Sequence, residues 1–393
     1  MHDDVKGTPV IERFRRPRKA IDVEHSIVYR NDDEFCGMPF LFGLWKTSDS
    51  SLLASFRRAS VNYNNADDIH HDNLMVARGN VVSLRSTDNG STWDPETMNE
   101  VIDLSTSPDQ ITCGGPADYS PEGPVDFQDE DVLVASGGVP AIFVPNARPW
   151  IRISTDGGRA WRRPILLPMT GLSSLSGQGS AVVRADGMCL VALTSVTPDG
   201  WTRRPLVYAS PDGVHWNFLS FMTPISDDGQ AVSEKAGSPR FGAHRYFYPR
   251  PLALRSGRLI ATVRCQRDPT SVLWTELFES MDGGRTWQFL SRVNDWGAPG
   301  DICELSDGRI VCVYGYRLPP YGIRYRVSDD GGRTWGSELI LRDDGGSWDL
   351  GYPRVFEVDP GRCLAIYYFN RKDDPIQMNG GVRHIAQSVF TPE

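Results

Sequence analysis

The chain alternates short apolar runs with turns rich in Asp, Ser, Gly and Pro, and this pattern predicts an all-β protein. Six of the apolar runs follow a tight turn, and each has the length of one strand. Several are preceded by another strand that opens with Pro or Gly, as at Tyr248 and Pro249. Stretches with the 3.6-residue period of a helix are scarce. The six runs are Leu52–Phe56, Val132–Ala135, Leu190–Leu193, Leu259–Val263, Ile310–Val313 and Leu364–Tyr367.

An octapeptide with the pattern Ser-x-Asp-x-Gly-x-x-Trp recurs between these runs. Its Asp can accept hydrogen bonds from backbone N–H groups of the same turn, and its Gly supplies a positive φ. Its Trp can lie on the neighbouring strands. We therefore expect a clasp that closes a hairpin and has no catalytic role. The copies are Ser86–Trp93, Ser154–Trp161, Ser280–Trp287 and Ser328–Trp335, with a copy one residue shorter at Ser210–Trp216.

Each unit consists of strand, turn, strand, loop, strand, clasp and strand, and four antiparallel strands make a propeller blade. Six units predict a six-bladed β-propeller. The sixth unit lacks a clasp and ends in a strand over Val382–Phe390, and a strand near Glu24–Tyr29 can complete it. No linker interrupts the chain, so we expect one domain over residues 1–393, in which an N-terminal segment of about 1–35 closes the last blade.

Composition narrows the class of partner. The formal net charge of −9 argues against non-specific nucleic-acid binding, although a local Arg cluster can still bind an anion. No apolar run approaches the roughly 20 residues of a membrane span. The seven Cys are scattered, and the N-terminus has no apolar signal segment, so we expect reduced thiols and a cytoplasmic protein. P-loop, dinucleotide-binding and HExxH motifs are absent, so we expect no cofactor and no metal.

The octapeptides are similar to the Asp-box repeats of the sialidase superfamily, and the resemblance extends from about Gly37 to Phe390. It implies a site on the face opposite the clasps, where the innermost strands begin and the next strands end. In that superfamily three Arg bind the carboxylate of the sugar. A Tyr assisted by a Glu is the nucleophile, and an Asp on a first-blade loop is the acid/base. Lyases, other glycosidases and non-catalytic binders share the clasps, so the clasps alone specify function only weakly.

Four of the six second strands end in Arg at equivalent positions. Because a guanidinium group is a planar fork that matches a carboxylate, we expect these groups to form an anion-binding centre. The alternative is that each Arg pairs with an acid of a neighbouring blade. The candidate substrate-binding residues are Arg58, Arg264 and Arg317 at strand ends, and Gln178, Arg250, Asp301 and Arg354 at the starts of innermost strands.

The resemblance also implies catalytic roles. Tyr352, which opens the sixth blade, matches the nucleophile, and the loop before the first clasp offers Asp68 or Asp72 as the acid/base. Two positions depart from the superfamily: Met38 stands where the first-blade Arg is expected, and Pro251–Leu254 contains no Glu to assist the Tyr. These departures favour a hydrolase of another acidic sugar over a strict N-acetylneuraminidase.

The sequence therefore predicts an exo-acting glycoside hydrolase whose partner is an acidic carbohydrate, sialic-acid-like or uronic. A hydrolase with two catalytic carboxylates stays open, as does a non-catalytic carbohydrate-binding propeller. A polysaccharide lyase is the main alternative, because imidazole and phenol groups can move the protons that elimination requires. Its catalytic candidates are His71, His244 and Tyr248. The oligomeric state is not determined by these patterns.

Overall fold

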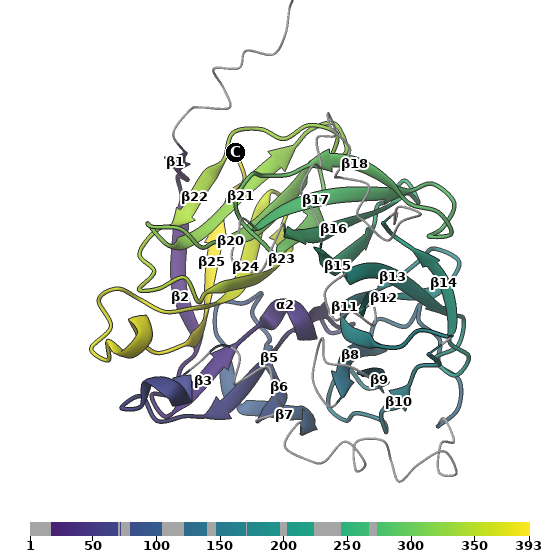
Figure 1. The fold of residues 1–393 in the computed structure, drawn as a ribbon, viewed down its shortest axis with the longest axis horizontal. Helices are drawn as coiled ribbons and strands as arrows, with labels where there is room; N and C mark the ends of the chain where they lie inside the picture. Colours follow the sequence, from purple (N-terminus) through teal and green to yellow (C-terminus); the bar gives the residue numbers. More distant parts are fainter. Residues whose placement is uncertain are drawn as a thin grey trace, which may run out of the picture.

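The structure is a computed structural model that describes residues 17–69, 71, 79–103, 122–139, 147–169, 171–196, 203–223, 245–266 and 273–393. Its strands form five hydrogen-bonded sheets around a central axis, and the eight-stranded sheet consists of two blades joined where β13 pairs with β15 (Figure 1). This arrangement confirms the predicted six-bladed β-propeller. Among the described residues, no helix is both long enough and apolar enough to cross a membrane. The helices with described bounds are α2 (Pro39–Phe42), η1 (Ala66–Ile69) and η4 (Met378–Gly380).

In the first three blades, the middle strands are buried on both faces. All eight residues of β12, for example, are buried, because the neighbouring blades cover the sheet on each side. This burial explains why the strand is a continuous apolar run instead of an alternating one. The first blade contains β3 (Glu34–Gly37), β4 (Gly43–Lys46), β5 (Leu52–Ser60), β6 (Asn80–Ser86) and β7 (Asp94–Asp103); the second, β8 (Leu133–Val139), β9 (Arg148–Ser154) and β10 (Ile165–Leu166); the third, β11 (Leu175–Val183), β12 (Cys189–Val196), β13 (Arg203–Ser210) and β14 (Asn217–Phe221).

The last three blades repeat this plan, and the N-terminal segment contributes to two of them. The fourth blade contains β15 (Arg245–Ala253), β16 (Leu259–Gln266), β17 (Leu273–Ser280) and β18 (Gln288–Arg292); the fifth, β19 (Gly300–Glu304), β20 (Ile310–Tyr316), β21 (Gly322–Ser328), β22 (Leu339–Arg342) and β1 (Arg18–Lys19); the sixth, β23 (Gly351–Asp359), β24 (Arg362–Phe369), β25 (His384–Phe390) and β2 (Val23–Tyr29).

The ring is closed by the N-terminal strand β2, which pairs antiparallel with β25 from Val23 opposite Phe390 to Tyr29 opposite Ile385. The sixth blade therefore combines both ends of the chain. The short strand β1 adds in parallel to the outer strand β22 of the fifth blade. Such closure leaves no gap between the first and last blades, which protects sheet edges that would otherwise be exposed.

Each clasp is held by its own Asp and Ser. In the first copy the Asp88 carboxylate accepts hydrogen bonds from the backbone N–H of Thr92 at 2.9 Å and from its hydroxyl at 2.6 Å. The Ser86 hydroxyl donates to the same carboxylate at 2.8 Å and accepts the N–H of Gly90 at 2.9 Å. The turn thus satisfies its backbone groups internally, as a structural role requires.

The clasps also connect neighbouring blades. Gly90 has a φ of 85°, and a Cβ atom at this position would lie 2.3 Å from Cδ1 of Leu364 in the sixth blade. Gly332 of the fifth blade approaches Leu277 of the fourth blade in the same way. The indole N–H of Trp93 donates to the side-chain oxygen of Gln387 in β25 at 2.8 Å. The repeated motif therefore fixes how adjacent blades pack.

The substitution Gly90→Ala tests this packing. We expect it to lower the free energy of unfolding by about 2–4 kcal/mol, because it combines a left-handed residue with a clash against a buried Leu. Gly361→Ala is the matched control, since Gly361 has a φ of 74° and no atom within 4 Å of the added Cβ. The control is expected to cost about 1–2 kcal/mol. Equal losses for both variants in chemical denaturation would exclude an inter-blade role for the Gly90 contact.

Candidate active site

Irregular starts of two innermost strands place two tyrosines side by side. Tyr248 in β15 and Tyr352 in β23 have left-handed backbone conformations, with φ of 56° and 49°. The strand register shifts at both places, between Phe247 and Arg250 and between Gly351 and Arg354. Such bulges re-aim side chains, and left-handed non-glycine residues are concentrated at functional sites. The two rings are buried, with centroids 5.6 Å apart.

Two guanidinium groups flank Tyr352. Arg264, near the end of β16, donates from Nη1 to the Tyr352 hydroxyl at 3.1 Å. Arg317, directly after β20, lies with its guanidinium carbon 5.0 Å from the centroid of the Tyr352 ring and donates from Nη2 to the carbonyl of Leu350 at 3.2 Å. Both Arg come from ends of second strands, as the repeat predicted.

The charges around Tyr352 favour its phenolate. Burial by itself raises the pKa of this phenol, but the positive charges of Arg264, Arg317 and His71 outweigh burial and lower the pKa to about 7. The neighbouring Tyr248 has the opposite shift: burial and the charge of Tyr352 raise its pKa well above the usual value. The two hydroxyl oxygens are 3.4 Å apart. When Tyr352 is ionised, its oxygen can only accept a hydrogen bond, and Tyr248 is then the donor of the pair.

A histidine and an aspartate complete the cluster. The Nδ1 atom of His71 is 2.6 Å from Oδ1 of Asp349, which also accepts the hydroxyl of Tyr368 at 2.6 Å. The other carboxylate oxygen accepts the Nε–H of Arg383 at 3.2 Å. The His71 ring is 6.1 Å from the Tyr352 ring and 5.6 Å from the ring of Trp348, which is 46% exposed. Trp348 thus borders the cluster on a side that solvent reaches.

The structure therefore brings together five of the predicted residues, which are Tyr352, Tyr248, Arg264, Arg317 and His71. Sequence reasoning missed Asp349, Tyr368 and Arg383 as members of the same cluster. The only signal for Asp349 was its place three residues before Tyr352. Tyr368 and Arg383 lie at the C-terminal end of β24 and directly before β25, where nothing in the repeat marks them.

Met38 and α2 occupy the place of the missing first-blade Arg. Met38 is buried, and its φ of 63° gives it the left-handed conformation of the two tyrosines. It precedes α2, whose Phe40 ring lies 6.4 Å from the Tyr248 ring and 6.4 Å from the Tyr352 ring, edge-on to each. An apolar wall therefore stands on the first-blade side of the phenols.

Two predicted residues are engaged elsewhere. Arg58 pairs with Glu34 at 3.6 Å and donates to the hydroxyl of Tyr29 at 3.4 Å, and its role in substrate binding stays a prediction. Successive residues of β5 point to opposite faces, and Arg58 points to the side of β3 and β2. The carboxylate of Asp68 accepts the backbone N–H of Asn62 at 2.7 Å and so closes the turn of its own loop. The acid/base role expected for Asp68 gains no support from this contact.

Arg250, Asp301 and Arg354 form a separate ionic group. Asp301 is completely buried and accepts the Nε–H of Arg250 at 2.6 Å, while its second oxygen accepts the N–H of Val355 at 2.7 Å and lies 3.4 Å from Nε of Arg354. Burial and the charge of Arg250 lower the pKa of Arg354 to about 9. Asp301 is thus committed to protein partners, which corrects its expected role as a substrate ligand. The alternative of inter-blade pairing holds for this group.

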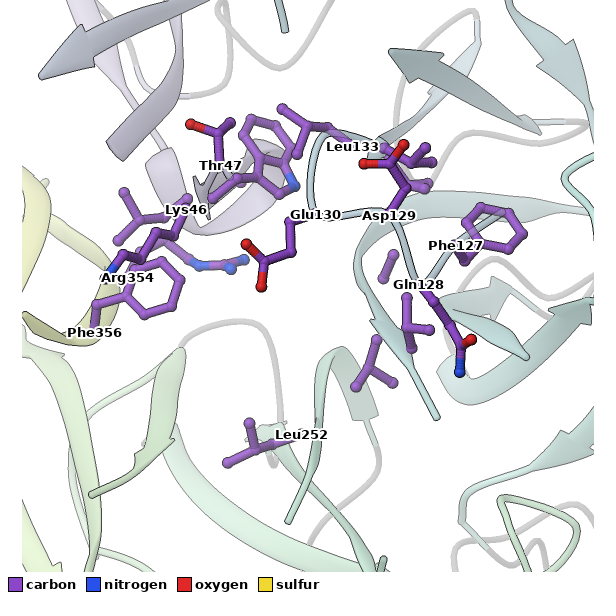
Figure 2. A pocket seen from close by; sticks show the side chains of 18 of the residues that line it. Lys46, Thr47, Phe127, Gln128, Asp129, Glu130, Leu133, Leu252, Arg354 and Phe356 are labelled. Carbon is purple, nitrogen blue, oxygen red and sulfur yellow. The ribbon is translucent and has the colours of Figure 1, made fainter. Parts of the chain in front are cut away.

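Arg250 and Arg354 border a cavity on the axis of the ring, with a volume of about 640 Å³. Its walls come from the innermost segments of five blades, and Figure 2 shows the Glu130 carboxylate directed into it. Lys46 and Phe356 lie beside Arg354 in the same view. Tyr352 and Arg264 do not border this cavity. The ionic group therefore belongs to the axial channel and not to the tyrosine cluster.

Three predicted residues are not tested by the structure. Asp72 and His244 lie outside the described residues, and so does the side chain of Gln178. Their roles stay predictions. Within the described part of the chain, no group of three or more His, Cys, Asp or Glu side chains is arranged to hold a metal ion.

The six blades and their repeated Asp-containing clasps define the chain as a sialidase-like β-propeller. Residues 132–363 match the model of the BNR repeat-like domain. Because this match covers more than half of the chain, the protein belongs to the BNR repeat-like domain family. No curated protein sequence matches it.

Solved structures confirm the fold. A protein of unknown function from Dyadobacter fermentans is 21% identical, with a TM-score of 0.71, over 95% of this chain and 99% of that one. Trypanosoma rangeli sialidase is 14% identical, with a TM-score of 0.57, over 94% of this chain but only 59% of that one. The GH93 α-L-arabinofuranosidase of Fusarium graminearum is 13% identical, with a TM-score of 0.58, over 94% and 97%. The fold is thus shared with glycoside hydrolases.

Replacing Arg264 tests the electrostatics of the cluster. In Arg264→Met we expect the pKa of Tyr352 to rise from about 7 toward the ordinary tyrosine value, because its hydrogen-bonded cation is gone. Ultraviolet difference titration of tyrosinate measures this shift, and Tyr352→Phe identifies which tyrosine titrates. Arg324→Met is the control, since Arg324 is another buried Arg that lies over a tyrosine, Tyr316. A near-neutral titration that survives in Arg264→Met would contradict the assignment.

Proposed function

We propose that the protein is a glycosidase that hydrolyses glycosides of a carboxylate-bearing sugar, with Tyr352 as the nucleophile. The observation that supports this function best is the buried Tyr352 hydroxyl in contact with Arg264, with its pKa lowered to about 7. A phenol is a weak nucleophile at neutral pH unless its pKa is depressed. An assisting Glu would activate the phenol as a base. Here two guanidinium groups and an imidazole instead stabilise the phenolate by their positive charge.

The same two guanidinium groups form the proposed binding site for the substrate carboxylate. Arg264 and Arg317 approach Tyr352 from different blades, and a carboxylate between them would form charge-assisted hydrogen bonds in a region of low dielectric. The guanidinium carbon of Arg317 is 5.6 Å from the centroid of the Trp348 ring, so an exposed aromatic ring lies next to this carboxylate site. A sugar ring can lie on such a face while its carboxylate meets the cations.

The proposed reaction retains configuration. Tyr352 attacks the anomeric carbon, the glycosidic bond breaks as its oxygen receives a proton, and water then releases the sugar from the tyrosine. The apolar wall of Met38 and Phe40 stands where the superfamily has a third Arg, so the proposed site binds the carboxylate with two cations instead of three. We therefore propose a uronic acid or another acidic sugar as the substrate in preference to N-acetylneuraminic acid.

A lyase is the second candidate, and the pair of phenols favours it. Tyr352 as the phenolate can take a proton from the carbon next to the carboxylate, while Tyr248, 3.4 Å away, donates one to the leaving oxygen. Arg264 and Arg317 would then neutralise the substrate carboxylate. The two candidates share their residues and differ in their product.

One incubation separates these functions. Acidic disaccharides and 4-nitrophenyl uronides are mixed with the protein, and both reducing ends and the ultraviolet absorbance of an unsaturated uronate are measured. Reducing sugar without unsaturated product supports the hydrolase, and unsaturated product supports the lyase. Binding without either product would reject an enzymatic function and identify a carbohydrate-binding propeller.

Tyr352→Phe is expected to reduce kcat/KM by about 10³-fold or more, because the variant has no nucleophile. In the native enzyme kcat/KM should rise with pH through an apparent pKa of about 7, since only the phenolate of Tyr352 reacts. In Arg264→Met this acidic limb should move to higher pH. Asp374→Asn, which removes a buried carboxylate paired with Arg30, is the control and should leave the limb in place. Activity retained in Tyr352→Phe would refute the nucleophile.

A further inference from the structure

We propose that His71 is the proton donor to the leaving group at this site and that Asp349 is the residue that positions it. This inference rests on the proposed function, because it assigns the acid of the same reaction. It differs from the expectation drawn from the sialidase resemblance, in which an Asp of the first-blade loop supplies the proton. The supporting observations are the contacts of Asp349, in the loop before β23, with His71 of the first-blade loop and with Tyr368 and Arg383 of the sixth blade.

Asp349 is held rigidly. Its carboxylate is buried and receives hydrogen bonds from Tyr368, Arg383 and His71. A further hydrogen bond, from the side-chain amide of Asn370 to the Asp349 carbonyl at 2.6 Å, fixes its backbone. A buried carboxylate is stable only when such partners compensate for the lost hydration. Burial opposes its ionised form, but His71 and Arg383 hold the pKa of Asp349 well below its usual range.

This carboxylate determines which nitrogen of His71 can exchange protons. Nδ1 is committed to Asp349 at 2.6 Å, so Nε2 is the nitrogen that can give a proton to a substrate. The ring lies between the exposed Trp348 and the buried Tyr352. The proposed sugar site is bounded by the same two rings. His71 is therefore placed next to the bond that Tyr352 attacks.

The charges that face His71 favour its protonated form. Burial and the positive charge of Arg317 favour the neutral ring, but the charge and hydrogen bond of Asp349, together with Tyr352, outweigh them and raise the pKa of His71. The lowered pKa of Tyr352 and the raised pKa of His71 thus favour an ionised phenol beside a protonated imidazole. A nucleophile without its proton and an acid with its proton are what the first step needs.

The proposed step balances as follows. The Tyr352 oxygen forms a bond to the anomeric carbon with its lone pair. The electron pair of the glycosidic bond passes to the leaving oxygen, which takes the proton from Nε2 of His71. In the second step neutral His71 removes a proton from water, the water oxygen replaces Tyr352 on the carbon, and both residues regain their starting states.

Leaving-group dependence tests this role. His71→Gln should lower kcat/KM by about 10²–10⁴-fold on an acidic disaccharide, whose sugar leaving group needs a proton. The same variant should lose less than about 10-fold on the 4-nitrophenyl glycoside, because nitrophenolate leaves without one. Equal losses on both substrates would overturn the proposal, since a merely structural histidine affects them alike.

Asp349→Asn tests the positioning role. With its charge gone the pKa of His71 should fall, so the alkaline limb of kcat/KM, where His71 loses its proton, should move to lower pH. Asp374→Asn is the matched control, because it is also a buried carboxylate paired with an Arg. An alkaline limb that stays in place in Asp349→Asn would overturn the role of Asp349.

Nuclear magnetic resonance separates failure of this inference from failure of the proposed function. Titration of the His71 ring signals in the native protein and in Asp349→Asn requires no substrate. If no acidic glycoside is turned over, the proposed function fails, yet a lower His71 pKa in Asp349→Asn still supports the Asp349 contact. An unchanged titration in a folded Asp349→Asn variant contradicts the positioning role whether or not the protein is an enzyme.

Discussion

The contact between the Arg264 guanidinium and the Tyr352 hydroxyl is the interaction on which the rest of the site depends. A cation in this buried setting needs a negative partner, and the phenol is the group that can become one by releasing its proton. Arg317 and His71 strengthen the same effect from two other blades. The buried positive charges are thus compensated by the phenolate, and for this reason the pKa of Tyr352 is lowered to about 7.

The geometry of the propeller brings these arginines and tyrosines together. The ends of second strands place long cationic side chains at one rim of the ring, and the bulged starts of innermost strands place the phenols at the same rim. The two kinds of strand are antiparallel neighbours within a blade, so an Arg and a Tyr meet at the same rim. The clasps at the other end of the blades fix the spacing between sectors, as Gly90 against Leu364 shows.

The departures from the sialidase pattern change the charges around Tyr352 but do not change the six-bladed fold. The site has an apolar wall at Met38 and Phe40 where a third cation is expected. It also has a His71–Asp349 pair, and the positive charge of His71 is one of those that lower the pKa of Tyr352.

The sequence by itself determined the fold, because the clasp repeats and the apolar runs are local patterns with a fixed physical meaning. It also determined that Arg264, Arg317, Tyr248 and Tyr352 occupy equivalent rim positions. Only the tertiary structure decided which side chains pair. Arg58 pairs with Glu34, and Asp301 pairs with Arg250 and Arg354. Asp349 contacts His71, which is 278 positions away in the chain. A repeat specifies where a side chain begins, whereas the direction of its charged end depends on bulges and on partners that other blades contribute. For that reason the ring was predictable and the pairing of its charges was not.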